Sequence, residues 1–266
     1  MNKSVILITG ASAGIGRECA NHLSSSGWNV VGASRRGLSD SPWQGVVMDV
    51  DDNVSVTRAF DQVLTEHGAP SAVLACAGWG LAGAAEQSSI EDAMAQLNTN
   101  FWGAVRVVNA ALPGLRERGG GHIVLMSSIG GILGIPYQAF YSASKFALEG
   151  YAESLAYEVA PFNVHVTLVE PGNFKTDFTA ARRKVVVTGD DPYRAACEKA
   201  IALMERDEIR GADPADVAKV VEKILQSKNP PRRVSVGKLD ERMGIMGKRL
   251  LPYRIFEKAA KSSLGV

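Results

Sequence analysis

Short apolar runs alternate with longer amphipathic segments along most of the chain. Seven runs have the length of buried strands: Val5–Ile8, Asn29–Ala33, Val46–Met48, Ala72–Cys76, His122–Met126, Val164–Val169 and Arg233–Val236. Between them, apolar residues recur at helical spacing near residues 14–26, 53–67, 88–117, 140–160 and 213–227. This alternation is typical of βαβ units, so the chain is predicted to form a parallel sheet covered by helices.

Two segments interrupt the alternation. Residues 173–212 are longer than an ordinary crossover, and the tail from about 238 places Met243, Met246, Leu250 and Tyr253 at helical spacing, with Pro252 able to restart a helix. No repeat or linker marks a second domain. We therefore predict one domain over residues 1–266, with a substrate-side excursion near 173–212 and a helical basic tail over 238–266.

Composition narrows the class of protein. The chain has 266 residues, 46% of them hydrophobic, and its net charge of +1 gives no general reason to expect nucleic acid as a partner. Its three cysteines, Cys19, Cys76 and Cys197, lack metal-type spacing, and their odd number favours a reducing compartment. Because neither a signal peptide nor a membrane span is recognisable, a soluble cytoplasmic protein is expected.

A glycine-rich turn follows the first predicted strand. In Thr9–Gly16 the order is Thr-Gly-Ala-Ser-Ala-Gly-Ile-Gly, and a helical pattern comes next. Glycines let backbone N–H groups approach a pyrophosphate, and a helix N-terminus favours its negative charge. The spacing differs from the general G-x-G-x-x-G fingerprint, and such a turn can also be purely structural. Its place on the first strand of a βαβ series favours dinucleotide binding.

The end of the second strand bears on the choice of cofactor. A carboxylate there would bind the ribose 2′-hydroxyl of NAD, whereas arginine accommodates the 2′-phosphate of NADP. No Asp or Glu occurs from Asn29 to Ser39, while Arg35 and Arg36 are adjacent. Both arginines could be solvated loop residues, but phosphate recognition by Arg35, with Ser34 and Arg36 as further contacts, is the preferred interpretation. NADP(H) is therefore expected over NAD(H).

Tyr141 and Lys145 suggest acid/base chemistry. They stand four residues apart in a segment that can begin a helix, so both lie on one helix face. A nearby ammonium is expected to lower the pKa of the phenol from about 10, which would make Tyr141 a usable general acid/base. The pair alone is weak evidence. Its weight comes from Ser127 and Ser128, which end an apolar run shortly upstream, and from the glycine turn.

Several motifs in one order together resemble the short-chain dehydrogenase/reductase family, over roughly residues 4–237. The matching segments are Thr9-Gly-x-x-x-Gly14-Ile-Gly16, Asp49-Val50, Ala77-Gly78, Asn100, Ser128, Tyr141-x-x-x-Lys145 and Pro171-Gly172-x-x-x-Thr176. The resemblance implies a three-layer, doubly wound Rossmann fold with a seven-stranded parallel sheet. It also implies an oxidoreductase (EC 1.1.1.-) that transfers a hydride between nicotinamide and a carbonyl or secondary alcohol.

The resemblance assigns roles residue by residue. Tyr141 would transfer the proton, Lys145 would lower its pKa and hold the nicotinamide ribose, and Ser128 would position the substrate oxygen. Asn100 would anchor a water that connects Lys145 to solvent, and Thr176 would contact the carboxamide. The positions expected to bind the cofactor are Gly10, Ser12, Gly14, Ile15, Gly16, Ser34, Arg35, Arg36, Asp49, Val50, Ala77, Gly78, Tyr141, Lys145, Pro171, Gly172 and Thr176.

Three of these assignments have alternatives. Ser128 is chosen over Ser127 because it precedes Tyr141 by the usual family interval, and Asn100 could instead be a helix-packing amide. Asp49 could bind the adenine or cap the next helix. One departure is plain: Ala75-Cys76 replaces two asparagines of the family's Asn-Asn-Ala-Gly segment. That change puts local hydrogen bonding in doubt more than catalysis.

The residues around Tyr141 look especially like those of hydroxysteroid and retinol dehydrogenases, which implies an apolar substrate and a ketone reductase activity. Pocket candidates, any of which could equally be core, are Trp79, Leu81, Leu133, Ile135, Tyr137, Phe174 and Phe178. The main alternative function is a catalytically silent dinucleotide-binding or redox-sensing protein, which should have lost Tyr141, Lys145 or Ser128.

Two features of the sequence bear on partners. Helices 88–117 and 140–160 form subunit contacts in many relatives, so a homodimer or homotetramer is expected by resemblance. From Lys228 to Val266 the chain has ten Lys/Arg against three Asp/Glu, mixed with apolar residues. That tail could contact a membrane, although a pocket cover or a subunit-contact helix with a solvated basic face is the favoured interpretation.

Overall fold

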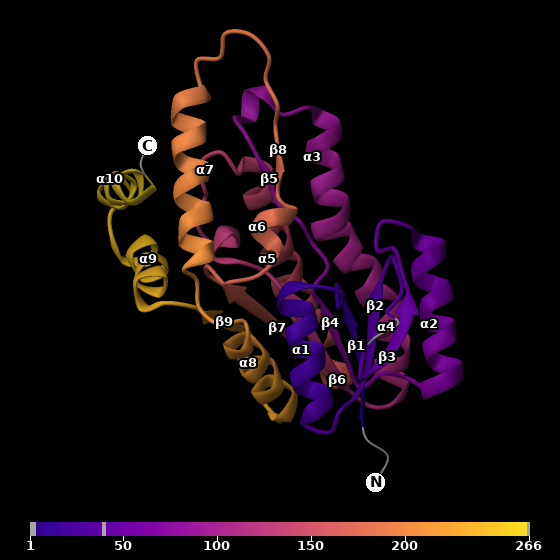
Figure 1. Ribbon diagram of the computed structural model, residues 1–266. Coiled ribbons are helices and arrows are strands. Elements are labelled where there is room, and N and C mark those ends of the chain that lie inside the picture. Colours follow the sequence, from indigo (N-terminus) through magenta and orange to yellow (C-terminus); the bar gives the residue numbers. More distant parts are fainter. Residues whose placement is uncertain (1–3, 39–40, 265–266) are drawn as a thin grey trace.

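The seven predicted strands form one sheet in the computed structural model, which describes residues 4–38 and 41–264 (Figure 1). They are β1 (Val5–Thr9), β2 (Asn29–Ser34), β3 (Gln44–Val47), β4 (Ala72–Ala75), β6 (Gly121–Met126), β7 (Val164–Pro171) and β9 (Arg233–Val236). Every pair is parallel, in the order β3-β2-β1-β4-β6-β7-β9. The predicted doubly wound fold is thus confirmed. The ends of the predicted domain, residues 1–3 and 265–266, lie outside the described residues.

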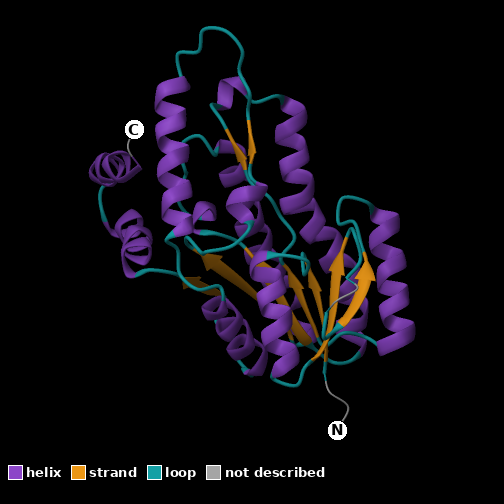
Figure 2. Cartoon of the chain, viewed as in Figure 1, coloured by secondary structure: helices purple, strands orange, loops and turns teal. Residues whose placement is uncertain are grey.

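Helices cover both faces of the sheet and make three layers (Figure 2). Those bounding the main core are α1 (Gly14–Ser25) and α8 (Ala215–Gln226) on one face, and α2 (Asn53–His67), α4 (Ala104–Glu117) and α5 (Ala139–Val159) on the other. Successive β1 side chains alternate between these two cores: Ile6 and Ile8 pack toward α1 and α8, and Val5 and Leu7 toward α2 and α4. Burial on both faces explains why the strands read as continuous apolar runs.

The prediction of one continuous helix over residues 88–117 is wrong. It consists of α3 (Ile90–Leu97), a π-helical turn at Asn98–Gly103 and α4. Ser89 caps α3 by accepting a hydrogen bond from the N–H of Asp92, 3.0 Å away. Single π turns inside helices are frequent at functional sites, and this one carries Asn100.

The excursion over 173–212 contains regular structure that its sequence pattern did not predict. It holds α6 (Phe178–Ala181), β8 (Arg183–Lys184) and α7 (Arg194–Ile209). β8 pairs in parallel with β5 (Leu81–Ala82) in a separate two-stranded sheet. The excursion is therefore hydrogen-bonded to the chain that follows β4, above the carboxyl ends of the main strands (Figure 1).

The tail forms two helices, α9 (Leu239–Leu250) and α10 (Tyr253–Leu264), and Pro252 lies between them as expected. The Glu241 carboxylate accepts hydrogen bonds from the N–H groups of Lys238 and Asn173, both at 2.9 Å. These bonds fix the start of α9 to the chain just after β7. Among the described helices, none has the length and apolar content needed to cross a bilayer. Short 3₁₀ turns are found at Ala85–Gln87, Ile129–Gly131 and Ala160–Phe162.

Candidate active site

One cavity of about 610 Å³ runs along the carboxyl ends of the central strands. Strand order reverses direction at β1 and β4, and the crevice at such a point is where open α/β sheets bind ligands. Arg35, after β2, lines one part of it, and Tyr141 and Lys145 on α5 line another. The walls on the far side come from α7 and the segment around Phe178.

The glycine-rich turn is shaped by close backbone contacts. A Cβ on Gly16 would lie 2.4 Å from the carbonyl oxygen of Gly10, and one on Gly10 would lie 2.9 Å from the backbone of Ala77. Gly10 also has a φ of +70°, which side chains disfavour. The Thr9 hydroxyl accepts hydrogen bonds from the N–H groups of Cys76 and Ala77, at 3.1 and 3.2 Å. Thr9 thereby joins the ends of β1 and β4, where the two family asparagines are missing.

All but one of the positions predicted to bind a cofactor line this cavity. The exception is Arg36: in the described structure Arg35 lines it and Arg36 does not. The lining positions are Gly10, Ser12, Gly14, Ile15, Gly16, Ser34, Arg35, Asp49, Val50, Ala77, Gly78, Tyr141, Lys145, Pro171, Gly172 and Thr176.

Asp49 lines the cavity but does not cap α2. Its Oδ1 accepts a hydrogen bond from the N–H of Asp51 at 3.0 Å, within the turn that follows β3. The helix cap is Asp52, whose Oδ1 accepts from the N–H of Val54 at 2.9 Å. Of the two roles considered for Asp49, helix capping is therefore wrong, and contact with an adenine ring stays a prediction.

Ser128, Tyr141 and Lys145 come together where β6 ends and α5 begins. All three residues are buried, and the Ser128 hydroxyl donates to the carbonyl of Pro171 at 3.5 Å while lying near enough to Tyr141 to affect the pKa of its phenol. The Lys145 ammonium donates to the carbonyl of Met126 at 2.8 Å and lies 5.9 Å from the centroid of the Tyr141 ring. Ser128 is fixed further by the N–H of Gly130, which donates to its Oγ at 3.0 Å.

The Asn100 side chain is occupied by protein groups. Its Oδ1 accepts from the N–H of Trp79, and its Nδ2 donates to the Trp79 carbonyl, both at 3.0 Å. Nδ2 also donates to the hydroxyl of Ser144 at 3.1 Å. Asn100 therefore connects the π turn, the chain after β4 and α5. Its role toward a water near Lys145 stays a prediction.

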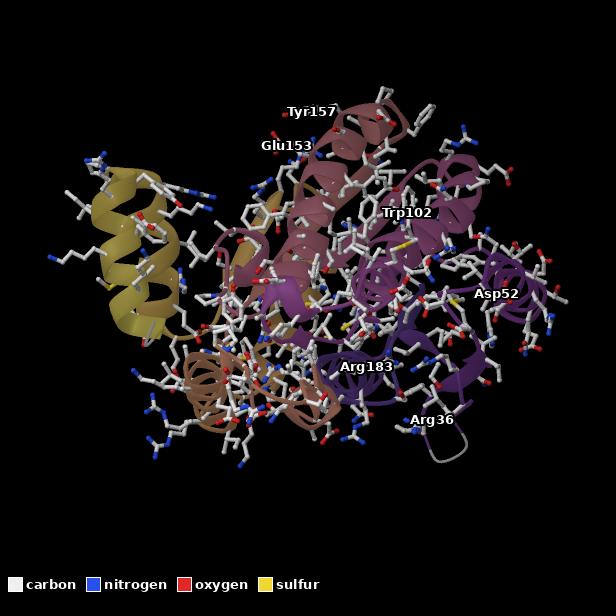
Figure 3. All side chains as sticks on the ribbon, turned by 90° about the horizontal axis from the view of Figure 1, so that it is seen from above. Arg36, Asp52, Trp102, Glu153, Tyr157 and Arg183 are labelled. Atoms are coloured by element: carbon white, nitrogen blue, oxygen red, sulfur yellow. The ribbon has the colours of Figure 1, made fainter. Side chains whose placement is uncertain are left out.

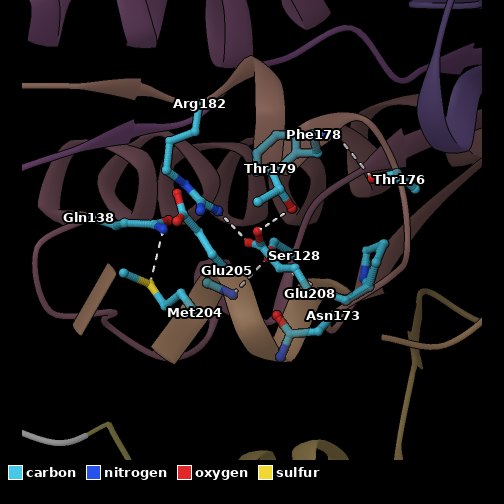
Figure 4. Close-up of polar contacts among 12 residues, drawn as sticks. Ser128, Gln138, Asn173, Thr176, Phe178, Thr179, Arg182, Met204, Glu205 and Glu208 are labelled. Carbon is cyan, nitrogen blue, oxygen red and sulfur yellow. Dashed lines mark hydrogen bonds and ion pairs between the residues drawn. The ribbon is translucent and has the colours of Figure 1, made fainter. Parts of the chain in front are cut away.

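The excursion places a buried ion pair beside Phe178 (Figure 4). Arg182 is paired with Glu208 of α7, and the side-chain exposures of the two residues are 0% and 13%. Thr179 donates to the other Glu208 oxygen at 2.6 Å. The Phe178 ring lies between this pair and Tyr141, with its centroid 5.9 Å from that of the Tyr141 ring and 5.8 Å from Cζ of Arg182.

The apolar pocket candidates are partly confirmed. Trp79, Leu133, Ile135, Phe174 and Phe178 line the cavity. Leu81 is instead a buried residue of β5, and Tyr137 lies outside the lining in the described structure. Sequence reasoning missed several further lining residues, which the excursion and the start of α5 bring in: Gln138, Ala181, Arg183, Leu203, Met204, Asp207 and Glu208.

Comparison with known proteins is consistent with this geometry. The family model for short chain dehydrogenase matches residues 4–186. A 3-ketodihydrosphingosine reductase of Bacteroides thetaiotaomicron is 40% identical over 263 residues, 98% of each chain. The chain belongs to the short-chain dehydrogenase family. Retinol dehydrogenase 8 of Bos taurus is 34% identical, with 86% of this chain and 80% of that protein covered. The crystal structure of a short-chain dehydrogenase from Streptomyces avermitilis superposes with a TM-score of 0.84, at 30% identity and 98% coverage of both chains.

The residues of this short-chain dehydrogenase fit a nicotinamide dinucleotide. The turn before α1 is held open by glycines whose Cβ positions are filled by backbone, so N–H groups at the helix start stay accessible to a phosphate. Gly14 lies beside Thr176, since a Cβ there would be 3.6 Å from that of Thr176. The glycine turn and the segment after β7 thus face each other across one cavity. The protein is an NAD(P)-dependent oxidoreductase of this family.

The prediction that Lys145 lowers the pKa of Tyr141 is wrong for this arrangement. Burial raises the pKa of the Tyr141 phenol, and the neighbouring Ser128 hydroxyl lowers it less. The loss of hydration disfavours the phenolate, whereas the Lys145 ammonium points to the Met126 carbonyl. Burial also lowers the pKa of Lys145, to about 8. This arrangement of side chains thus favours the neutral phenol, which is the form that can give a proton.

Glu149 gives the short-chain dehydrogenase a buried carboxyl one turn beyond Lys145. Ser127 donates a hydrogen bond to its Oε1, and Arg233 lies 3.5 Å from Oε2. Burial raises the pKa of Glu149 to about 7, well above its ordinary value of 4.5. The choice of Ser128 over Ser127 is consistent with this contact, since the hydroxyl of Ser127 is occupied by Glu149.

Glu149→Gln is expected to change how stability depends on pH. Between about 4.5 and about 7 the folded chain holds a proton on Glu149 that the unfolded chain releases. Protonation therefore stabilises the folded wild type at the acidic end, and this contribution is lost as pH rises through the window. Urea unfolding of both proteins would measure it. The wild type should lose stability relative to the variant from about pH 4.5 to about 7, and a difference independent of pH would contradict the shift.

Proposed function

We propose that this chain is an NADP(H)-dependent reductase of apolar ketones, with Tyr141 as the general acid/base. The observation that carries the proposal is the single cavity that joins Arg35, the glycine turn, Tyr141 and an apolar wall. When bound, the nicotinamide cofactor supplies the hydride in reduction and accepts it in oxidation. The chain has to hold the cofactor, orient the substrate carbonyl and move one proton.

Tyr141 would donate its hydroxyl proton to the substrate oxygen as that oxygen gains negative charge. Ser128, whose hydroxyl lies beside Tyr141 in the same cavity, would hold the same oxygen in place. Lys145 would place a positive charge near the phenolate that remains after proton transfer, when the need for that charge is greatest. The backbone N–H groups from Gly14 to Gly16 would bind the pyrophosphate.

The substrate proposed for this site is a long-chain ketone that carries an amine, as in the 3-ketodihydrosphingosine named for the Bacteroides relative. Leu133, Ile135, Leu203 and Met204 offer an apolar wall for an alkyl chain. Asp207 lines the same cavity and offers a half-exposed carboxylate to an ammonium group, whereas both oxygens of Glu208 are held by Arg182 and Thr179. An α-amino ketone would contact both the apolar wall and this carboxylate, whereas an apolar ketone without an amine would contact the apolar wall alone.

A panel of carbonyl compounds tests the substrate and the cofactor together. We expect oxidation of NADPH, followed by its absorbance, to be fastest with 3-ketodihydrosphingosine and slower with a steroid ketone or retinal. NADH should be less effective by roughly ten- to a hundredfold, because one charge-assisted contact to the 2′-phosphate is lost. Binding of NADPH without turnover of any carbonyl or alcohol would favour a catalytically silent protein. The presence of Ser128, Tyr141 and Lys145 argues against that alternative.

The oligomeric state expected from the sequence is also a proposal. A homodimer or homotetramer is proposed from the family resemblance, with contacts through the α3–α4 region and α5. Trp102 and Tyr157 support the proposal, since both are exposed large side chains on these segments, at 51% and 69% (Figure 3).

A further inference from the structure

Helix α9 carries an exposed apolar stripe along its whole length. Leu239, Met243, Met246 and Leu250 are 72%, 60%, 59% and 75% exposed. At about 100° per residue these four positions fall within an arc of about 60°, so they form one continuous line of apolar side chains. Ile245, on the opposite side of the helix, is 4% exposed and packs toward the body of the protein.

Arginines flank this stripe and continue onto α10. Arg242 and Arg249 project from one side of it, and Arg254 and Lys258 follow on α10, all of them exposed. No ion pair is recorded for these four cations within the described part of the chain, whereas Lys261 is paired with Glu257 at 3.0 Å. An apolar stripe beside unpaired basic side chains is the arrangement of helices that lie in a membrane interface.

The position of α9 is fixed relative to the active site. Its start is held by Glu241, which binds the N–H of the cavity-lining residue Asn173. Near its end Lys248 donates to the carbonyl of Ile132, and Gly244 lies against Leu133, which lines the cavity. Figure 1 shows α9 and α10 at one edge of the molecule, beyond α7, and Figure 3 shows side chains of these C-terminal helices directed away from the body.

We propose that α9, together with the start of α10, is the surface by which this protein docks on an anionic lipid bilayer. The apolar stripe would enter the acyl boundary while Arg242, Arg249 and Arg254 remain at the phosphates. A second copy of the chain is a poorer occupant, since a two-fold contact would bring the same patch and its arginines together. A pocket cover, one of the two interpretations of the tail favoured from the sequence, leaves this exposed stripe unexplained, and the other, a subunit contact, is an outcome of the test below.

The proposal does not depend on the identity of the substrate, but it bears on how an apolar substrate would reach the cavity. A helix that lies in the interface and touches Leu133 would hold one wall of the active site close to the bilayer. An apolar ketone dissolved in the membrane would then reach the cavity without crossing much water.

Co-sedimentation of the full chain with vesicles tests the docking surface. Vesicles of equal parts phosphatidylglycerol and phosphatidylcholine should bind the protein, and phosphatidylcholine alone should bind it much more weakly. Reversing Arg242, Arg249 and Arg254 to Glu should lower affinity for the anionic vesicles by at least about a hundredfold, since each basic residue near such a surface contributes roughly fivefold. Replacing Leu239, Met243, Met246 and Leu250 by Ser should reduce binding to a similar degree.

Matched controls separate docking from general effects of charge and hydrophobicity. Arg58→Glu with Lys223→Glu changes exposed cations elsewhere, and Val54→Ser with Leu64→Ser removes exposed apolar side chains from α2. Both control proteins should bind vesicles as the wild type does. Reduction of a short water-soluble ketone, measured without lipid, should be unchanged in all variants, which shows that each is folded.

Two results would overturn the proposal. One is equal sedimentation of the wild type and the stripe variant with anionic vesicles. The other is a change of oligomeric state in the stripe variant without lipid, measured by sedimentation velocity, because the stripe would then be a subunit contact. Neither result depends on whether the enzyme reduces a sphingoid ketone, so failure of the docking surface and failure of the proposed function are distinguishable.

Discussion

Replacing Tyr141 by phenylalanine is expected to lower turnover by about 10²–10⁴-fold, the usual contribution of general acid/base assistance. The ring is kept, so its contact with Phe178 and the shape of the cavity should persist. Only the hydroxyl that lies near Ser128 and would protonate the substrate is lost. Steady-state kinetics with NADPH and a reactive ketone measures the effect, and fluorescence titration should show cofactor affinity close to that of the wild type.

Tyr151 on the same helix provides the control. Its hydroxyl is also buried, and it has no hydrogen-bond partner among the described residues. Its ring packs at 88° to that of Phe101, outside the cavity. Tyr151→Phe should therefore turn over at nearly the wild-type rate. Near-normal turnover in Tyr141→Phe, with Tyr151→Phe equally active, would reject Tyr141 as the acid/base group.

Arg35→Asp is expected to weaken NADPH binding by roughly ten- to a hundredfold and to improve the relative use of NADH. The guanidinium of Arg35 lines the cavity at the end of β2, where the 2′-phosphate of NADP would be recognised. A charge-assisted hydrogen bond contributes on the order of 1.5–3 kcal/mol. Aspartate would repel that phosphate and offer an acceptor to the 2′-hydroxyl of NAD. Titrating NADPH and NADH into the wild type and the Arg35→Asp variant measures this change in cofactor preference.

Arg36→Asp is the matched control, because it makes the same change of charge one residue away. Arg36 is exposed but does not line the cavity in the described structure, so the variant should lose less NADPH affinity than Arg35→Asp. Equal losses would mean that the phosphate is recognised through the general positive field of both residues. Wild-type affinity for NADH as high as for NADPH would show that phosphate recognition does not decide the cofactor.

Most of the sheet and the first half of the site could be predicted from local sequence. Strands buried on both faces are unbroken apolar runs, and the glycine turn is visible because Gly10 and Gly16 occupy places where backbone leaves no room for a side chain. Tyr141 and Lys145 share a helix face for reasons of spacing alone. These features depend on residues that are neighbours in the chain.

The features that the sequence did not predict depend on contacts between residues far apart in the chain or on burial. β5 and β8 are two residues each and pair across about a hundred positions, too short to show any periodicity. Helix α7 buries few apolar residues, chiefly Ala200 and Ile201, so its pattern is weak. The Arg182–Glu208 pair exists only once the excursion is folded. The direction of the Tyr141 pKa shift depends on desolvation, which residue spacing does not contain.

The π turn at Asn98–Gly103 has a consequence for insertions and deletions. Such a turn holds one residue more than an α-helical turn, so everything after it is rotated by about 100° relative to an uninterrupted helix. Val107, Ala111 and Leu115 face the sheet in this rotated frame. Removing a single residue between Asn98 and Gly103 would straighten the helix, but it would turn the buried side of α4 toward water and withdraw Asn100 from Trp79. The length of this segment is therefore constrained more tightly than the identity of most residues in it.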